Sequence, residues 1–220
     1  MLRPRSQVEP VDESCSVESL WNPARNSDRA GSRALVSGAT GNFGSAAVAV
    51  ALAMGAACVV APGRNERVLA DLARRFGNRV RAVKLTGDAN ADTERMKQAA
   101  PGPIDCVLDI LPPHAGTAPV RAAAMTVRAY GRVVLMGGVG MLGGDDLALP
   151  YPWLMRNCIT VLGQWMYKPD AALRVAALIR AGLLQIDGYE IAEFGLNDAN
   201  KAVAHAAENS GPFKLTVLRP

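Results

Sequence analysis

The sequence has few of the side chains that bind metal ions. Its two histidines, His114 and His205, are far apart, and no two cysteines have the CxxC spacing of a zinc site. We therefore expect no zinc. Cys58 and Cys106 lie in apolar runs typical of strands, where buried and reduced thiols are expected. The remaining cysteines are Cys15 and Cys158.

Signals for export or membrane insertion are also missing from the sequence. No uninterrupted apolar run reaches the length that a membrane-spanning helix needs. The N-terminal residues have no apolar core of the signal-peptide type, and the acids Glu9, Asp12 and Glu13 argue against a transit peptide. We expect a soluble, cytoplasmic protein that does not bind a membrane.

Neither aromatic residues nor an excess of one charge dominates the composition. Aromatic residues make up 5% of the chain and the net charge is only +4, with Lys and Arg spread among Asp and Glu. This pattern lacks the basic patch of a nucleic-acid-binding protein, so no nucleic-acid partner is expected. Half of the residues are hydrophobic, mostly Ala, Val and Leu, which suits helices packed closely on parallel strands.

The order of apolar segments predicts an α/β fold. Residues 1–31 are rich in Ser, Pro, Asn and Arg and predict a poorly ordered tail with one short helix around Val17–Trp21. After Arg33, strands and helices alternate about six times with short connections. Strands without a polar face predict a doubly wound, mainly parallel Rossmann sheet with helices on both faces. We expect this domain to span residues 32–188.

The individual elements follow from apolar periodicity and from glycine and proline positions. Strands are expected at 34–36, 58–61, 80–85, 104–111, 131–137 and 159–162, and helices at 45–54, 65–76, 92–100, 116–125 and 171–181. The last segment, 189–220, departs from this rhythm and predicts a strand–helix–strand appendage at 191–194, 197–208 and 213–218. Met136, Trp153, Trp165 and Met166 are assigned to core packing, with the lining of a pocket as the alternative.

A glycine-rich turn joins the first strand to the first helix. It has the sequence GATGNFG at positions 38–44. Glycine at 41 would let a diphosphate approach the unpaired amides of the helix N-terminus, and glycine at 44 would let the helix pack closely on the strand. The turn predicts a dinucleotide-binding site, with a structural turn as the alternative. The residues expected to contact the phosphates are Thr40, Gly41, Asn42 and Phe43.

The end of the second strand carries no acidic residue. An acid there would bind the adenosine ribose of NAD, whereas the stretch Ala61–Asn65 offers Arg64, which can pair with the 2′-phosphate of NADP. We therefore expect NADP(H) in preference to NAD(H), with Arg64 as a solvated residue at the start of a helix as the alternative. The missing acid also disfavours an S-adenosylmethionine-dependent methyltransferase. Asp88, after the third strand, is expected to border the adenine or to be an ordinary turn residue.

The ends of the fourth and fifth strands are expected to flank the nicotinamide. Ligands of open α/β sheets lie outside the carboxyl ends of the strands, and glycines there would let the cofactor pass close to the main chain. The residues expected at this position are Leu111, Gly137, Gly138 and Val139.

Several motifs occur in the order of a known family. They are GATGNFG at 38–44, DCVLD at 105–109, YGRVVLMGG at 130–138, FGLNDANKA at 194–202 and GPFKL at 211–215. With these motifs the chain, from about residue 31 onward, resembles the medium-chain dehydrogenase/reductase family of zinc-type alcohol dehydrogenases and quinone oxidoreductases. The resemblance implies hydride transfer with NAD(P)(H) to or from a small alcohol, carbonyl, enone or quinone. It also implies a homodimer formed through the last sheet strand, around Ile159–Leu162.

The resemblance covers the nucleotide-binding part of that family and not its catalytic domain. The catalytic domain normally precedes the glycine turn, and residues 1–31 do not resemble it. The segment 189–220 is then expected to lack most of the sheet it would join, leaving Ile191, Phe194 and Leu196 partly exposed. This leaves two hypotheses, an NADP(H)-dependent oxidoreductase or an NADP(H)-binding module without turnover.

No residue is assigned as catalytic. His114 follows the fourth strand and is the nearest acid–base candidate, while His205 is expected on a solvated helix face. Tyr167 and Lys168 are adjacent, and the Tyr-x-x-x-Lys spacing of short-chain dehydrogenases occurs nowhere in the chain. This absence argues against that competing family.

Overall fold

The structure is a computed structural model that describes residues 31–167 and 169–220. Cys15, the helix expected around Val17–Trp21 and nearly all of the expected tail lie outside the described residues.

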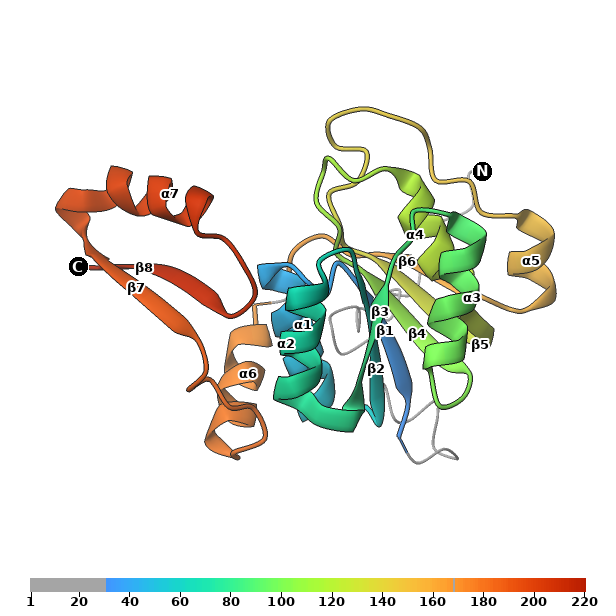
Figure 1. Ribbon diagram of the computed structural model, residues 1–220, viewed down its shortest axis with the longest axis horizontal. Coiled ribbons are helices and arrows are strands. Elements are labelled where there is room, and N and C mark those ends of the chain that lie inside the picture. The colour runs from blue at the N-terminus through green and yellow to red at the C-terminus, as the bar shows by residue number, and fades with distance from the viewer. Residues whose placement is uncertain (1–30, 168) are drawn as a thin grey trace, which may run out of the picture.

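Six parallel strands form the central sheet (Figure 1). Their order is β3-β2-β1-β4-β5-β6, so the chain reverses its direction of winding between β1 and β4. This order and the all-parallel pairing confirm the predicted doubly wound Rossmann fold. The strands are β1 (Arg33–Ser37), β2 (Cys58–Gly63), β3 (Val80–Lys84), β4 (Ile104–Asp109), β5 (Val127–Leu135) and β6 (Thr160–Gly163).

Helices cover both faces of this sheet (Figure 1). Successive strand residues point to opposite faces, so Val36 packs in a cluster with α1 and α2 while Leu35 packs in a cluster with α3 and α4. Both clusters are buried, as expected of strands without a polar face. The helices are α1 (Asn42–Ala53), α2 (Glu66–Phe76), α3 (Ala89–Ala99), α4 (Thr117–Ala124), α5 (Tyr151–Arg156) and α6 (Ala171–Arg180), with a 3-10 turn η3 (Gly77–Arg79) after α2.

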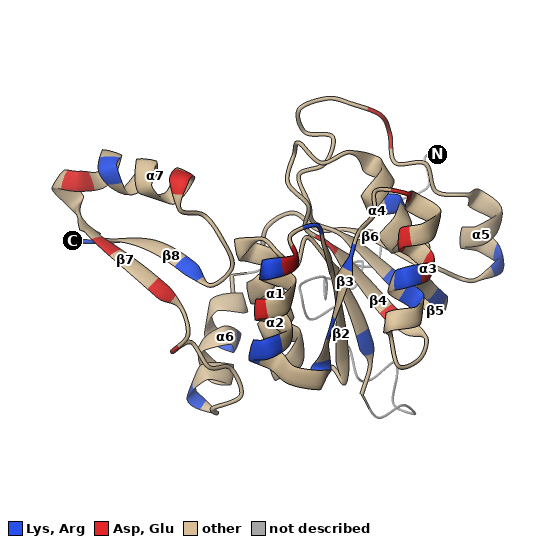
Figure 2. Ribbon diagram, viewed as in Figure 1, with Lys and Arg blue, Asp and Glu red and all other residues tan. Residues whose placement is uncertain are grey.

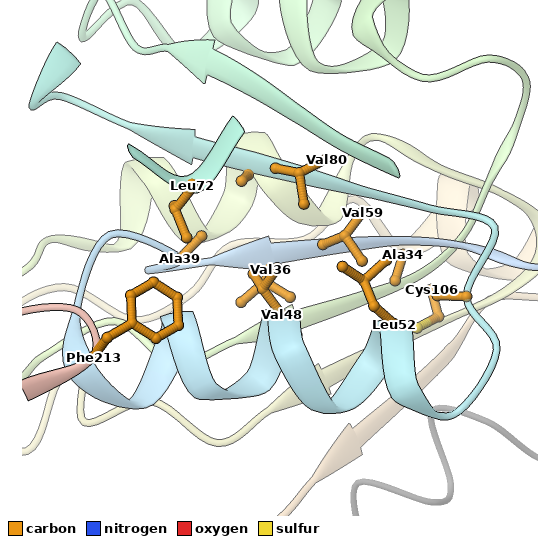
Figure 3. Packing of buried hydrophobic residues seen from close by; sticks show 12 residues of the cluster. Ala34, Val36, Ala39, Val48, Leu52, Val59, Leu72, Val80, Cys106 and Phe213 are labelled. Atoms are coloured by element: carbon orange, nitrogen blue, oxygen red, sulfur yellow. The ribbon is translucent and has the colours of Figure 1, made fainter. Parts of the chain in front are cut away.

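The cluster on the α1 side includes a residue from the far end of the chain. Figure 3 shows Phe213 beside Val48 of α1 and Leu72 of α2, in the same cluster as Val36 and Val59. Phe213 is only 9% exposed. The C-terminal segment therefore shares a hydrophobic core with the sheet domain.

The chain closes with the predicted strand–helix–strand unit. β7 (Glu190–Gly195) and β8 (Lys214–Arg219) pair in parallel, and α7 (Ala199–Glu208), preceded by the 3-10 turn η4 (Leu196–Asp198), connects them. Ile191 and Leu196 are 53% and 59% exposed, as expected. Phe194 is half-buried because its ring lies 5.3 Å from that of His205.

Several elements differ from the prediction. Helix α5 was not among the predicted helices, although proline fits the first turn of a helix. Strand β2 continues through Pro62, since beyond Val60 its register aligns it with β3 and no longer with β1. Strand β5 begins at Val127, before an irregularity at Tyr130, where φ is +60°.

The buried side chains agree only partly with the expected core. Cys58 and Cys106 are buried, as predicted, and burial raises the pKa of the Cys106 thiol to about 12. Trp153 packs against the cluster on the α3 side. The core assignment is wrong for Trp165 and Met166, which are 72% and 56% exposed because they follow the edge strand β6.

Charged residues of both signs share the same elements. Figure 2 shows acidic and basic positions mixed along α2, α3 and β7–β8. No helix among the described residues combines the length and apolarity required to cross a bilayer.

Candidate dinucleotide-binding site

The turn between β1 and α1 lies at the carboxyl edge of the parallel sheet. Gly38 has a φ of +95°, a conformation that favours glycine. The amide of Gly41 donates to the Gly38 carbonyl oxygen at 3.0 Å, which closes the turn. A Cβ atom at position 44 would lie 1.9 Å from that same oxygen. Gly44 is thus required for α1 to pack on the turn.

The N-terminus of α1 is open to an anion. Gly41 is its N-cap residue and has no side chain to cap the helix, and the first turn has no acidic residue. Among the described residues, a Cβ atom at Gly41 would meet only the Gly38 carbonyl oxygen, at 3.4 Å. Unpaired amides and the helix dipole make such an end suitable for a diphosphate.

The remaining residues of the turn take different positions. The Thr40 side chain packs against Gly63 at the end of β2, because a Cβ atom on Gly63 would lie 2.4 Å from Thr40 Cγ2. The Asn42 carbonyl accepts a hydrogen bond from Ser45 Oγ at 2.9 Å. Phe43 is 77% exposed. The turn thereby joins the end of β2, where an adenosine would lie, to the helix that would hold the phosphates.

Basic side chains gather at the end of β2. Arg64 follows Gly63 and is exposed, and Asn65 caps α2 by accepting from the Val68 amide. Lys84 is aligned with Gly63 across the β2–β3 pair and forms an ion pair with Glu66 of α2. This pair was missed in the sequence, since its two residues are 18 positions apart and only the β2–β3 register brings them together.

The side chain of Asp88 caps the N-terminus of α3. Its carboxylate accepts from the Ala91 amide at 2.7 Å and caps α3. The neighbouring Asp92 is buried and accepts from the amides of Thr86 and Gly87. Burial opposes the charge of Asp92, but these hydrogen bonds and Arg95 outweigh it and lower its pKa. Both acids therefore order the loop after β3.

The loops after β4 and β5 lie against each other. The Gly138 amide donates to the Leu111 carbonyl oxygen at 2.8 Å. A Cβ atom at Gly137 would lie 2.7 Å from the same oxygen, and one at Gly138 would lie 2.7 Å from Pro113 Cγ. The structure thus brings Leu111, Gly137 and Gly138 together, with Val139 half-buried after them. A Cβ atom at Gly38 would approach Ile110, next to Leu111, at 3.0 Å, which places the phosphate turn beside this pair of loops.

One buried acid at this junction had no role in the sequence interpretation. Asp109, the last residue of β4, is 3% exposed and is aligned with Ser37, the residue before Gly38. Burial raises the pKa of its carboxyl group to about 6, and hydrogen bonds from the Ser37 hydroxyl and the Leu111 amide limit the rise. The signal in the sequence was an acid at the end of a strand that is buried along its whole length, where charged residues are rare.

The acid–base candidates do not assemble into a catalytic group. His114 is exposed on the loop after β4. His205 is not solvated as expected: it is half-buried, and its Nδ1 lies 3.0 Å from Thr216 Oγ1. Among the described residues no three His, Cys, Asp or Glu side chains are close enough together to hold a metal ion. This part of the chain therefore does not provide the ligand set of a zinc centre.

Comparison with known proteins identifies relatives of this fold. Residues 43–181 match the sequence model of a family described as zinc-binding dehydrogenase. A thermostable alcohol dehydrogenase from Pyrobaculum aerophilum is 25% identical over 93% of this chain and 55% of its own, with a TM-score of 0.63. L-idonate 5-dehydrogenase from Escherichia coli K-12 MG1655 is 20% identical over 91% of this chain and 54% of its own, with a TM-score of 0.62.

A third relative is the crotonyl-CoA carboxylase/reductase AntE, solved in complex with NADP. It is 18% identical over 86% of this chain and 50% of its own, with a TM-score of 0.66. The search of curated proteins found no match. The chain spans about half the length of these solved relatives. The matched segment covers more than half of the chain, and it contains the last two residues of the glycine turn, Phe43 and Gly44, together with Asp109 and the loop after β5. The chain thus belongs to the zinc-binding dehydrogenase family, of which it represents the nucleotide-binding Rossmann portion.

Proposed function

We propose that the chain binds NADP(H) and acts in hydride transfer to or from a small alcohol, carbonyl, enone or quinone. The observation that carries this proposal is the uncapped N-terminus of α1, opened by Gly41 at the carboxyl edge of the sheet. The nicotinamide would supply or accept the hydride. The residues of this chain bind and orient the cofactor: the first turn of α1 holds the diphosphate, and the loops at Leu111 and Gly137–Val139 border the nicotinamide.

The preference for NADP(H) over NAD(H) is supported by the charges at the end of β2. Arg64 and Lys84 are the nearby cations, and the strand itself ends without an acid. A 2′-phosphate would accept charge-assisted hydrogen bonds from these side chains.

Cofactor titration combined with an activity assay tests the proposal. Quenching of Trp153 or Trp165 fluorescence would report binding of NADPH and NADH, and absorbance at 340 nm with aldehydes, enones and quinones would report turnover. Tighter binding of NADPH together with turnover supports the full proposal. Absence of binding for both cofactors contradicts it.

Binding without turnover would support the alternative of an NADP(H)-binding module. The exposure of Ile191 and Leu196 on the C-terminal unit favours this alternative, because it offers apolar surface to a partner. The same assay separates the two functions.

A homodimer formed through β6 is part of the proposal. β6 is an edge strand whose Thr160, Val161 and Gly163 are exposed, and an exposed edge can pair with a second copy. Light scattering coupled to gel filtration would measure the mass. A dimer in the wild type and a monomer in Val161→Lys are expected, whereas a wild-type monomer contradicts this assembly.

A further inference from the structure

The carboxyl group of Asp109 lies where the ends of three strands meet. Asp109 is aligned with Ser37 of β1 on one side and with Leu135 of β5 on the other. Its carbonyl oxygen accepts from the Met136 amide at 3.0 Å. The side chain therefore occupies the point between β1 and β4 where the winding of the sheet reverses and where ligands of this fold bind.

The side chain connects the two halves of the candidate site. The Ser37 hydroxyl, next to the phosphate turn, and the Leu111 amide both lower the pKa of its carboxyl group against the effect of burial. Gly137 packs directly against it, since a Cβ atom at Gly137 would lie 2.5 Å from Asp109 Oδ2. Oδ1 is buried and has no hydrogen-bond partner among the described residues. An ionised carboxylate is poorly solvated in such a position.

The charged residues of β1, β4 and β5 lie away from Asp109, and Arg121 of α4 donates to the Ala148 carbonyl oxygen at 3.1 Å. Arg33 of β1, Asp105 of β4 and Arg128 of β5 gather at the opposite end of the sheet, where the Arg33 amide and the Arg128 guanidinium bind Asp105 at 2.7 and 2.6 Å. Arg132 of β5 is aligned with Cys106 in the middle of β4, and α1 has no charged residue. The Ser37 hydroxyl and the Leu111 amide oppose the effect of burial on the pKa of Asp109, and no charged side chain contributes to it.

We propose that Asp109 is a positioning residue for the dinucleotide, which sets the spacing of the phosphate turn and the Gly137 loop and takes up a proton when the diphosphate binds. This inference rests on the proposed cofactor binding. A diphosphate over the adjacent turn adds negative charge, which disfavours ionisation of a buried carboxylate. By linkage, the protonated form of Asp109 then binds the dinucleotide more tightly.

The expected pH dependence has a definite sign. The pKa of Asp109 in the free protein is about 6, and the bound diphosphate raises it further. Affinity is therefore highest below pH 6, falls as the pH rises through the free pKa, and levels off above the pKa of the complex. A rise in pKa of half a unit to one unit gives a decrease of about threefold to tenfold.

NAD⁺ binding to the full chain tests the inference. Isothermal titration between about pH 5 and 8 would measure the dissociation constant for the wild type, Asp109→Asn and His114→Gln. NAD⁺ is chosen because its diphosphate keeps its charge in this range and it lacks the titrating 2′-phosphate. His114→Gln controls for the exposed histidine on the neighbouring loop, since histidine side chains titrate in the same range.

We expect the decrease with pH in the wild type and in His114→Gln, and a flat profile in Asp109→Asn. Calorimetry of the wild type in buffers of different ionisation enthalpy would also detect proton uptake near pH 6.5, about half a unit above the free pKa, and this measurement needs no variant to fold. A flat wild-type profile, no proton uptake, or an unchanged slope in a folded Asp109→Asn overturns the inference while leaving cofactor binding intact. Failure of NAD⁺, NADH and NADPH to bind at any pH contradicts the proposed function itself.

Discussion

The guanidinium of Arg75 lies 4.0 Å from the ring centre of Phe213 and joins α2 to the C-terminal unit. The same side chain donates from Nη1 to the Gly188 carbonyl oxygen at 2.9 Å. Phe213 also contacts the rings of Phe76 and Tyr189, at centroid distances of 6.0 and 5.5 Å. A cation over an aromatic cluster, together with a buried ring, thus attaches the strand–helix–strand unit to the sheet domain.

Truncation of Phe213 should destabilise the whole chain. Removing a buried phenyl ring costs about 3–5 kcal/mol in the free energy of unfolding, so Phe213→Ala should show a large loss in urea denaturation. Leu196→Ala is the matched control, because Leu196 is 59% exposed and its loss should change stability by less than about 0.5 kcal/mol. Equal effects of the two substitutions would show that Phe213 is not part of the shared core.

Alanine at two positions of the phosphate turn should have different effects. At Gly44 a Cβ atom would lie 1.9 Å from the Gly38 carbonyl oxygen, so Gly44→Ala should lower the melting temperature and abolish cofactor binding. At Gly41 the added Cβ atom has room at 3.4 Å and the φ of −88° suits alanine. Gly41→Ala should therefore keep the melting temperature but reduce affinity by about tenfold or more, because its methyl group obstructs the approach of the phosphates to the amides of α1.

Thermal melting and cofactor titration of both variants would check this pair. Normal binding by Gly41→Ala would argue that the diphosphate does not approach this face of the turn.

The parts of the fold that were predicted correctly depend on residues that are close together in the sequence. Strands such as β4 are buried on both faces, so an apolar run was sufficient to predict them. The glycines at 38, 41 and 44 predicted the turn because the backbone conformation of Gly38 and the close contacts at Gly41 and Gly44 involve neighbouring residues of the turn. Contacts that depend on register were not visible: the Lys84–Glu66 pair requires the alignment of Lys84 with Gly63, and the position of Asp109 requires β1 and β5 on either side.

Charge changes at the end of β2 should alter the choice of cofactor. Arg64→Gln should weaken NADPH binding by about tenfold or more and leave NADH binding nearly unchanged, since a hydrogen bond to a charged group contributes about 1.5–3 kcal/mol. Glu66→Gln should have the opposite effect, because it releases Lys84 from its ion pair and removes a negative charge. Arg67→Gln on the same helix is the control.

Dissociation constants for NADPH and NADH in each variant would give the ratio of the two affinities, which measures the preference for one cofactor over the other. If the ratio stays constant in both Arg64→Gln and Glu66→Gln, the 2′-phosphate does not bind at this end of the sheet.

The stability of the chain should also depend on the ionisation of Asp109. The pKa in the folded chain is about 6, above the ordinary value of 3.8, so the folded state binds more protons than the unfolded state between these values. The stabilisation from this group is present below about pH 4 and is lost as the pH rises through 6. The free energy of unfolding of Asp109→Asn minus that of the wild type should therefore rise by about 2 kcal/mol from pH 4 to pH 7.

Urea denaturation of both proteins at several pH values would measure this difference, in which the other carboxylates cancel. A difference that does not change with pH would mean that Asp109 has an ordinary pKa in the folded chain.

Helix α2 connects the proposed adenosine-binding end of β2 to the attachment of the C-terminal unit. It begins after Arg64, where the adenosine of a cofactor would lie, and it ends at Phe76, in contact with Phe213. Its eleven residues extend about 16 Å. The loop at Arg64 and the attachment of β7 and β8 are therefore held at the two ends of one continuous helix.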